Sequence, residues 1–267
     1  MSRAMLLGGL LALVTGAASA ADILPPAPSL DSAHLRGRFE LEAGAYVRAD
    51  ASFGWLRGHH PASTFTSDVS SFRFDATRFE RVPVTGLGVG YQINGFLRTD
   101  LTVEQRGSAR YQASASYVDG AACGAVRCAD AYAGAIRSTL VMANAYGEIG
   151  SWFDVTPFVG LGLGLARHAF EPVSLPAGNG HDAGQSAGAT QTRFAFALMT
   201  GLAYDLTPQI KVETSYRYLN MGAARSGVII CASPAGACAG QTQSLGLSAH
   251  DLRIGLRYAL SSGSPQD

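Results

Sequence analysis

Apolar and polar residues alternate at every second position over long stretches of this sequence. Across residues 39–55 the odd positions are apolar, among them Phe39, Val47, Phe53 and Trp55, whereas most even positions carry polar residues or glycine. A repeat of two residues places successive side chains on opposite faces of a β-strand. The pattern recurs along the chain, in segments long enough to cross a bilayer rather than the usual strand of about 5–6 residues. The sequence therefore predicts an all-β fold whose strands have one apolar and one polar face.

Residues 1–20 have the features of a secretory signal peptide. Arg3 supplies a positive charge, residues 5–14 are almost continuously apolar, and residues 18–20 read Ala-Ser-Ala before Ala21. No later segment approaches the ~18 uninterrupted apolar residues of a membrane-spanning helix. Export without a helical anchor, combined with alternating strands, predicts a location in the bacterial outer membrane. The 20 basic residues balance the 20 acidic ones, so no basic excess favours nucleic acid as a partner.

Eight strands are expected after residue 38. They cover residues 39–55, 82–93, 96–108, 138–149, 156–166, 192–204, 210–221 and 247–260. The connections after the second, fourth and sixth strands are short, and the first of these contains Asn94-Gly95, a strong hairpin signal. The other connections are long, and an alternation of short turns with long loops is typical of outer-membrane barrels.

The predicted fold is thus a membrane-spanning, eight-stranded antiparallel up-and-down β-barrel over residues 39–260. The signal peptide (1–20) and a Pro-rich periplasmic arm (21–38) precede it, and a tail (261–267) follows it. An even number of strands returns both ends of the barrel to the periplasm and puts the long loops at the cell surface.

The predicted inward faces carry a nearly balanced set of charges. Seven bases and six acids belong to it: Arg48, Arg98, Arg106, Lys211, Arg217, Arg253, Arg257, Asp50, Asp100, Glu104, Glu148, Glu213 and Asp251. Eight strands enclose a space that side chains can just fill, and unpaired charges there would be costly. We therefore expect a salt-bridged lumen in which inward glycines, such as Gly88 and Gly162, make room for bulky neighbours.

Four cysteines form two close pairs in the expected long loops. Cys123 and Cys128 lie in one loop, and Cys231 and Cys238 lie in another. In an oxidising compartment such pairs indicate disulfides, and of the three possible connectivities the local one needs no contact between distant loops. No histidine lies close to either pair, so disulfides are favoured over a metal site, and no metal or cofactor is expected.

The last strand resembles the C-terminal signal by which the barrel-assembly machinery recognises its clients. Arg253, Gly255, Tyr258 and Leu260 supply its polar, glycine, aromatic and apolar positions. Such proteins commonly end on an aromatic residue, whereas this chain continues through residues 261–267. The resemblance implies that the assembly machinery is a partner during biogenesis.

Three segments resemble the small outer-membrane β-barrel proteins of alphaproteobacteria. Residues 88–104 (GVGYQINGFLRTDLTVE) look like the hairpin between the second and third strands, and residues 157–164 (PFVGLGLG) and 215–219 (SYRYL) are similar to the fifth and seventh strands. The resemblance covers roughly residues 39–260. It implies an OmpA-like barrel in a family that includes surface antigens, structural barrels and nominal porins.

We interpret the protein as a structural, surface-exposed, monomeric barrel in contact with outer-membrane lipid and lipopolysaccharide. The alternatives are a narrow channel for ions or small solutes, a loop-mediated adhesin or receptor, and a lipid-modifying enzyme. An enzyme is disfavoured because no nucleophile elbow is present and because His59, His60, His168, His181 and His250 fall mostly in expected loops.

Overall fold

The computed structural model describes residues 43–63, 70–118, 124, 126–177, 183–231 and 242–260, without the side chains of residues 70–72 and 231. These residues belong to one compact unit. The expected signal peptide, periplasmic arm and C-terminal tail lie outside them. Within the described part of the chain, no helix is long and apolar enough to span a bilayer.

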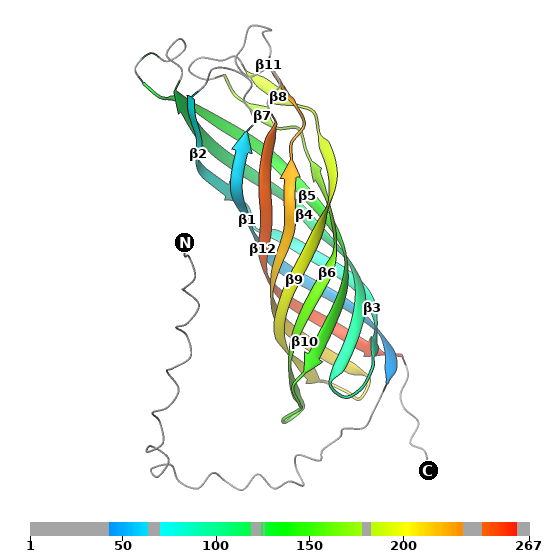
Figure 1. Cartoon of the computed structure of the whole chain (residues 1–267). Coiled ribbons are helices and arrows are strands. Elements are labelled where there is room, and N and C mark those ends of the chain that lie inside the picture. The colour runs from blue at the N-terminus through cyan, green and yellow to red at the C-terminus, as the bar shows by residue number, and fades with distance from the viewer. Residues whose placement is uncertain are drawn as a thin grey trace, which may run out of the picture. The chain divides into compact units, whose positions relative to one another are not determined.

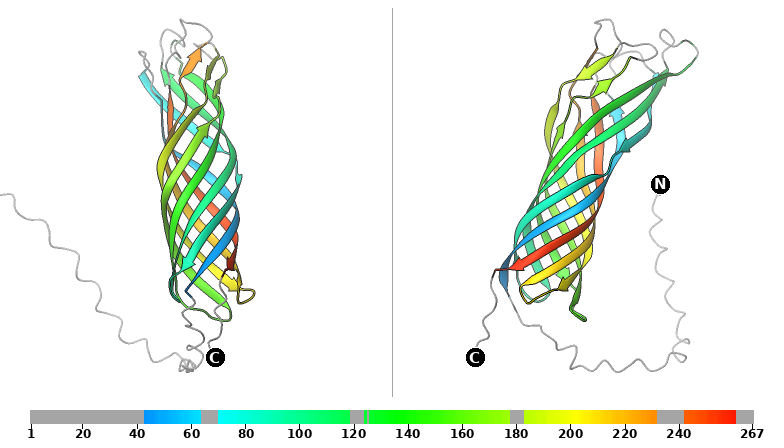
Figure 2. Two further views of the ribbon diagram at one scale, coloured as in Figure 1. Left: turned by 90° about the vertical axis from the view of Figure 1, so that its right-hand side faces the viewer. Right: turned by 180° about the vertical axis from the view of Figure 1, so that it is seen from behind.

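Eight antiparallel strands form a closed ring (Figure 1). In ring order they are β1 (Gly44–Ser63), β3 (Val82–Gln92), β4 (Leu97–Val118), β5 (Cys128–Glu148), β6 (Val155–Phe170), β9 (Ala189–Asp205), β10 (Ile210–Arg225) and β12 (Gln243–Ala259). The ring closes where β12 pairs with β1, with Tyr258 opposite Val47. The predicted eight-stranded barrel is confirmed, and Figure 2 shows how its strands tilt around the axis.

Four further strands extend the sheet at the end with the long connections. Strand β2 (Ser70–Phe79) pairs with the outer part of β4 and continues the line of β3 after an interruption at Glu80 and Arg81. The Glu80 amide still donates to the Arg110 carbonyl across that interruption. The short strands β7 (Ser174–Leu175), β8 (Gly184–Ser186) and β11 (Ile229–Cys231) form a small extension beside β5.

Most barrel strands are longer at this end than the sequence pattern predicted. The third expected strand stopped at residue 108 but continues to Val118, and the fourth was expected from residue 138 but begins at Cys128. Consequently the expectation that the histidines fall mostly in loops is wrong for the four that are described. His59 and His60 lie in β1, His168 in β6 and His250 in β12, whereas His181 lies outside the described residues.

An aliphatic band surrounds the middle of the barrel. On β6 the outward residues Val159, Leu161, Leu163 and Leu165 are each about half exposed, as side chains facing lipid must be. On β12 the band runs from Tyr258 to His250, and eight residues at about 3.3 Å each span roughly 26 Å along the strand. At a strand tilt of about 40° this corresponds to roughly 20 Å of height, somewhat less than the ~25 Å apolar band of outer-membrane barrels.

Pairing between β1 and β3 ends near the edge of this band. Beyond the Gly54–Val82 pair, the described part of β1 pairs with β12 alone, and β2 pairs with β4 alone. Side chains cover the seam instead, because the Arg81 guanidinium lies 5.4 Å from the Trp55 ring. Backbone groups left without a strand partner there can bind water, which is not possible within lipid.

The opposite end of the barrel is closed by short turns. Asn94 caps the β3–β4 turn through its side-chain oxygen, which accepts from the amides of Phe96 and Leu97. In the β5–β6 turn, Phe153 and Asp154 both adopt left-handed backbone conformations, with φ of 51° and 64°. Two consecutive residues with positive φ match the twist of a tight hairpin.

The lipid-facing assignment predicts a large effect of charge at Leu161. We expect Leu161→Arg to lower the free energy of unfolding from lipid vesicles by about 2–4 kcal/mol, because a guanidinium at mid-membrane loses its hydration. Leu161→Met is the matched control and should leave stability nearly unchanged, since its surface stays apolar. Denaturant titration in vesicles measures both, and equal stability of the two variants would contradict the assignment.

Candidate functional site

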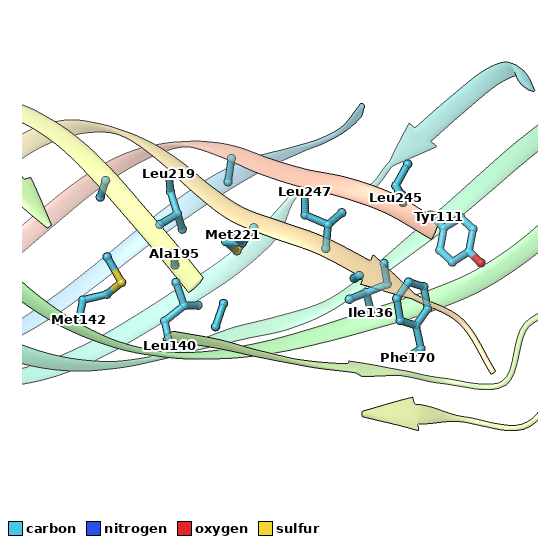
Figure 3. Close-up of a cluster of buried hydrophobic side chains, with 14 of the residues drawn as sticks. Tyr111, Ile136, Leu140, Met142, Phe170, Ala195, Leu219, Met221, Leu245 and Leu247 are labelled. Carbon is cyan, nitrogen blue, oxygen red and sulfur yellow. The ribbon is translucent and has the colours of Figure 1, made fainter. Parts of the chain in front are cut away.

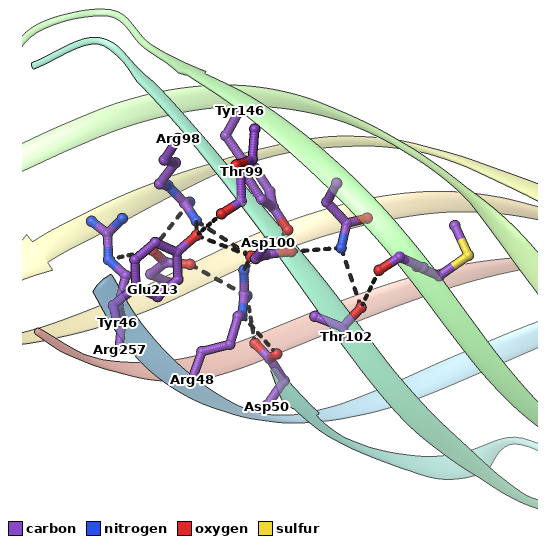
Figure 4. A network of polar contacts seen from close by, with 12 residues as sticks. Tyr46, Arg48, Asp50, Arg98, Thr99, Asp100, Thr102, Tyr146, Glu213 and Arg257 are labelled. Carbon is purple, nitrogen blue, oxygen red and sulfur yellow. Dashed lines mark hydrogen bonds and ion pairs between the residues drawn. The ribbon is translucent and has the colours of Figure 1, made fainter. Parts of the chain in front are cut away.

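The inward charges gather in the half of the barrel nearest the short turns. Eleven of the thirteen are buried, each with at most 8% of its surface exposed: Arg48, Asp50, Arg98, Asp100, Glu104, Arg106, Glu213, Arg217, Asp251, Arg253 and Arg257. They come from β1, β4, β10 and β12. Figure 4 shows part of this set, with the side chains pointing toward one another across the lumen.

Arg48 is at the centre of the first group of contacts. Its guanidinium binds Asp50 at 2.7 Å on its own strand and Asp100 at 2.8 Å on β4. It also donates to the Tyr146 hydroxyl at 3.0 Å. Asp100 in turn accepts from the Asn144 amide at 2.7 Å. Three strands are thereby joined through one arginine.

Arg217 is at the centre of a second group. Its two terminal nitrogens bind both oxygens of Glu104 at 2.7 Å, and it also contacts Asp251 at 2.7 Å. Arg106 forms a bidentate pair with Asp251 at 2.7 and 2.9 Å. Arg253 links the two groups, because it contacts Glu104 at 3.2 Å and Asp50 at 3.1 Å. Each acid therefore has at least two basic partners.

The third group lies at the rim formed by the short turns. Glu148 pairs with Arg98 at 3.0 Å and with Arg257 at 3.3 Å. Glu213 contacts Arg98 at 3.1 Å and Arg257 at 3.3 Å. Lys211 does not join the network, contrary to its assignment from the sequence. It pairs with Asp205 at 2.7 Å, and about a third of both side chains is exposed, because β10 is there close to its end.

Uncharged residues that the sequence did not single out complete the network. The Tyr46 hydroxyl lies 3.2 Å from Asp100, and the Arg98 guanidinium is 3.8 Å from the centre of the Tyr146 ring. Both tyrosines occupy inward positions of the alternating pattern, which was the available signal. Cation–π contact of this kind supports a guanidinium that is removed from water.

Inward glycines provide the space that these side chains fill. A Cβ at Gly90 would collide with Tyr46, and a Cβ at Gly160 would collide with Tyr146. Gly255 on β12 leaves room for Asp50 in the same way. Large residues on some strands thus pack against bare backbone on their neighbours.

The outer half of the lumen is predominantly apolar. Figure 3 shows part of this cluster, in which Leu140, Leu219, Met221 and Leu247 are almost completely buried. His168 lies among these residues, where Nδ1 contacts the Ser138 hydroxyl at 2.8 Å and Nε2 contacts the Met221 carbonyl at 3.0 Å. The pair is buried and both histidine nitrogens have partners, so it offers no exposed nucleophile.

The other predicted site residues fall at the two ends. Cys128 is buried at the start of β5. Cys123, Cys238 and the side chain of Cys231 are not among the described parts of the chain, so both disulfides stay predictions. In the expected assembly signal, Arg253 and Gly255 face the lumen, whereas Tyr258 and Leu260 are exposed on the outer face. No group of three or more His, Cys, Asp or Glu among the described residues could hold a metal ion.

A closed antiparallel barrel with an aliphatic outer band and a charged interior is the architecture of a transmembrane β-barrel. The chain belongs to the family described as the outer membrane protein beta-barrel domain, whose model matches residues 8–259. This family places the protein in the outer membrane.

Relatives and solved structures are similar to part or most of the chain. An uncharacterized protein of Brucella suis biovar 1 is 29% identical over 279 residues, which cover 96% of each chain. Outer membrane protein PagN of Salmonella typhimurium is 30% identical over 87 residues, 33% of this chain and 36% of PagN. OprG from Pseudomonas aeruginosa has a TM-score of 0.48 at 12% identity, covering 82% of this chain and 97% of OprG.

The geometry predicts that Arg217 is far more important for stability than an exposed base on the same strand. Arg217→Ala should cost about 3–5 kcal/mol, because Glu104 and Asp251 would stay buried with fewer compensating charges. Lys211→Ala is the control, with an expected cost of about 0–1 kcal/mol for its partly exposed pair with Asp205. Unfolding in detergent or vesicles measures both, and a cost below 1 kcal/mol for Arg217→Ala would contradict the paired-lumen interpretation.

Proposed function

We propose that the protein is a structural barrel of the outer membrane whose lumen is closed by its own side chains. In this proposal the chain ends and the short turns face the periplasm, and the long connections lie at the cell surface. The protein contributes to envelope integrity, acts as a monomer and carries out no catalysis.

The observation that supports this proposal most strongly is the burial of the lumen charges. Arg98, Arg217 and Asp251 expose at most 1% of their surface. In a water-filled pore, such charged side chains would be hydrated. A side chain without water-accessible surface in a barrel interior is surrounded by protein. Eight strands enclose a space that side chains can fill, unlike the wide lumen of a large porin.

The outer half of the lumen supports the same conclusion by different chemistry. Leu140, Met142 and Leu219 there have no measurable exposure. A hydrated ion crossing this part would lose water and gain few polar partners, which costs many kcal/mol for an isolated charge. The ionic half and the apolar half therefore act as two successive barriers.

Surface recognition is a second candidate function, which the length of the strands favours. Strands β4 and β5 have 22 and 21 residues, whereas about 9–11 suffice to cross a bilayer. The excess carries the long connections away from the lipid, where an adhesin or receptor would present them. Binding of the purified barrel to host cells or phage, lost when residues 119–127 are replaced by a short turn, would support this candidate.

Biogenesis gives a prediction about the last strand. Tyr258→Ala should lower the outer-membrane level of the protein, because Tyr258 supplies the aromatic position of the proposed assembly signal. Leu256→Ala is the matched control, since Leu256 is also outward and about half exposed but does not belong to that pattern. Fractionation and immunoblotting measure both, and equal levels would remove the argument for the signal.

Conductance distinguishes the closed barrel from the channel. We expect the wild-type protein in a planar bilayer to conduct ions poorly, because its lumen is filled. Arg217→Ala should raise conductance by removing a guanidinium from the packed cross-section. In a true channel, wild type would conduct steadily and neutralised lumen charges would change ion selectivity with little loss of stability. Large, stable wild-type conductance would overturn the proposal.

A further inference from the structure

A depression of about 460 Å³ lies on the outer surface of the barrel where β4, β5 and β6 meet. The side chains that line it include Gln105, Ser108, Arg137, Thr139 and Arg167. We call this set the arginine pocket. It lies beside the β-bulge of β4 between Arg106 and Ala109, which interrupts the regular pairing with β5. Most of its polar side chains point away from the lumen network described above.

The two arginines of the pocket are poorly neutralised. The Arg167 side chain forms no ion pair or hydrogen bond with the described residues, whereas its backbone pairs with β5 and β9. Arg137 is 60% exposed, and its nearest acid, Glu171, is 3.8 Å away and also accepts a 2.8 Å hydrogen bond from Ser108. The pocket therefore carries a positive charge that its own surroundings only partly balance.

The strand register brings these two arginines close together. Arg167 is directly opposite Thr139, and Arg137 is directly opposite Ala169. The arginines are thus diagonal neighbours on one face of the sheet, a relation in which Cβ atoms lie about 7–8 Å apart or less. Like charges at this separation repel, and an anion bound between them removes the repulsion. Guanidinium groups bind phosphate through two parallel hydrogen bonds, and a phosphate has enough oxygens to accept from both arginines at once.

The height of the pocket indicates where that phosphate comes from. Val141 is directly opposite Leu165, and both belong to the exposed aliphatic band. Thr139 and Arg167 occupy the next outward positions, about 7 Å farther along their strands. Arg137 lies one outward position beyond Thr139. A lipid whose phosphate binds here would lay its acyl chains on Val141 and Leu165, whereas a free anion would make no use of that surface.

We propose that the arginine pocket binds the phosphate of an anionic lipid headgroup in the leaflet nearest the long connections. Arg137 and Arg167 bind the phosphate oxygens, while Thr139 and Gln105 contact the sugar or glycerol hydroxyls beside it. This inference rests on the proposed orientation in one respect only. If the long connections face the cell surface, the lipid is a phosphorylated glycolipid of the outer leaflet.

The test compares two double variants that remove the same charge. Arg137→Gln with Arg167→Gln empties the pocket. Arg73→Gln with Arg110→Gln is the matched control, because both arginines are more than two-thirds exposed and each has an acid within 4.0 Å. Circular dichroism and thermal unfolding first establish that both variants are folded barrels.

Binding is then measured in phosphatidylcholine nanodiscs that contain diphosphoryl lipid A, the same lipid A without phosphates, or no lipid A, with native mass spectrometry as the readout. Wild type and control should retain diphosphoryl lipid A equally. The pocket variant should lose on the order of tenfold in apparent affinity, in line with the loss of charge-assisted hydrogen bonds. All proteins should bind the dephosphorylated lipid weakly.

Three results would overturn the proposal. They are unchanged lipid binding by the pocket variant, an equal loss in the control, and competition by millimolar inorganic phosphate that removes the lipid completely, which would make the pocket a site for soluble anions. Nanodisc binding does not depend on conductance or on orientation in the cell. Failure of this inference is therefore distinguishable from failure of the closed-barrel proposal, which the planar bilayer tests separately.

Discussion

A strand within a bilayer has no water to satisfy its backbone, so every N–H and C=O group must pair with a neighbouring strand. In this protein the pairing of β12 with β1 meets that requirement, and much of the remaining structure depends on it. A ring of eight strands leaves a lumen only as wide as side chains. Bulky residues such as Tyr46 and Tyr146 point inward where a glycine lies opposite them and leaves room for their rings.

The same requirement explains where the ring becomes incomplete. The described ladder between β1 and β3 ends after Gly54, near the level of Trp55, where the aliphatic band also ends. Beyond that level, unpaired backbone can be hydrated and the sheet can bend. Register irregularities in β1, β4 and β10 all fall in the outer parts of these strands. A β-bulge is tolerated where the solvent changes from lipid to water, and it increases the local twist.

Much of the barrel could be predicted from the sequence because lipid imposes a simple alternation, as in Val159–Leu165 with its intervening glycines. The outer halves were missed because the alternation reverses there. On β5, the apolar Leu140 and Ile136 point inward whereas the polar Arg137 and Thr139 point outward. Where the apolar face changes sides, the sequence shows no regular alternation.

The sequence also could not show which charged residues pair with one another. Arg106 and Asp251 are 145 residues apart, and only the register of three intervening ladders brings them together. Lys211 is on the same face of β10 as Glu213, but it lies at the rim because it is close to the end of the strand.

Because of this reversal, the outer part of the barrel has apolar side chains inside and polar ones outside, as a soluble protein does. The part within the membrane has the opposite arrangement. Beyond Gln105, β4 continues for 13 residues to Val118, which corresponds to roughly 30 Å of height for a strand tilted by about 40°. Leu245, Leu247 and the other apolar residues inside keep this outer part rigid by ordinary hydrophobic packing. In the orientation proposed above, this outer part forms a stalk that holds the outer ends of β4 and β5 well clear of the lipid headgroups.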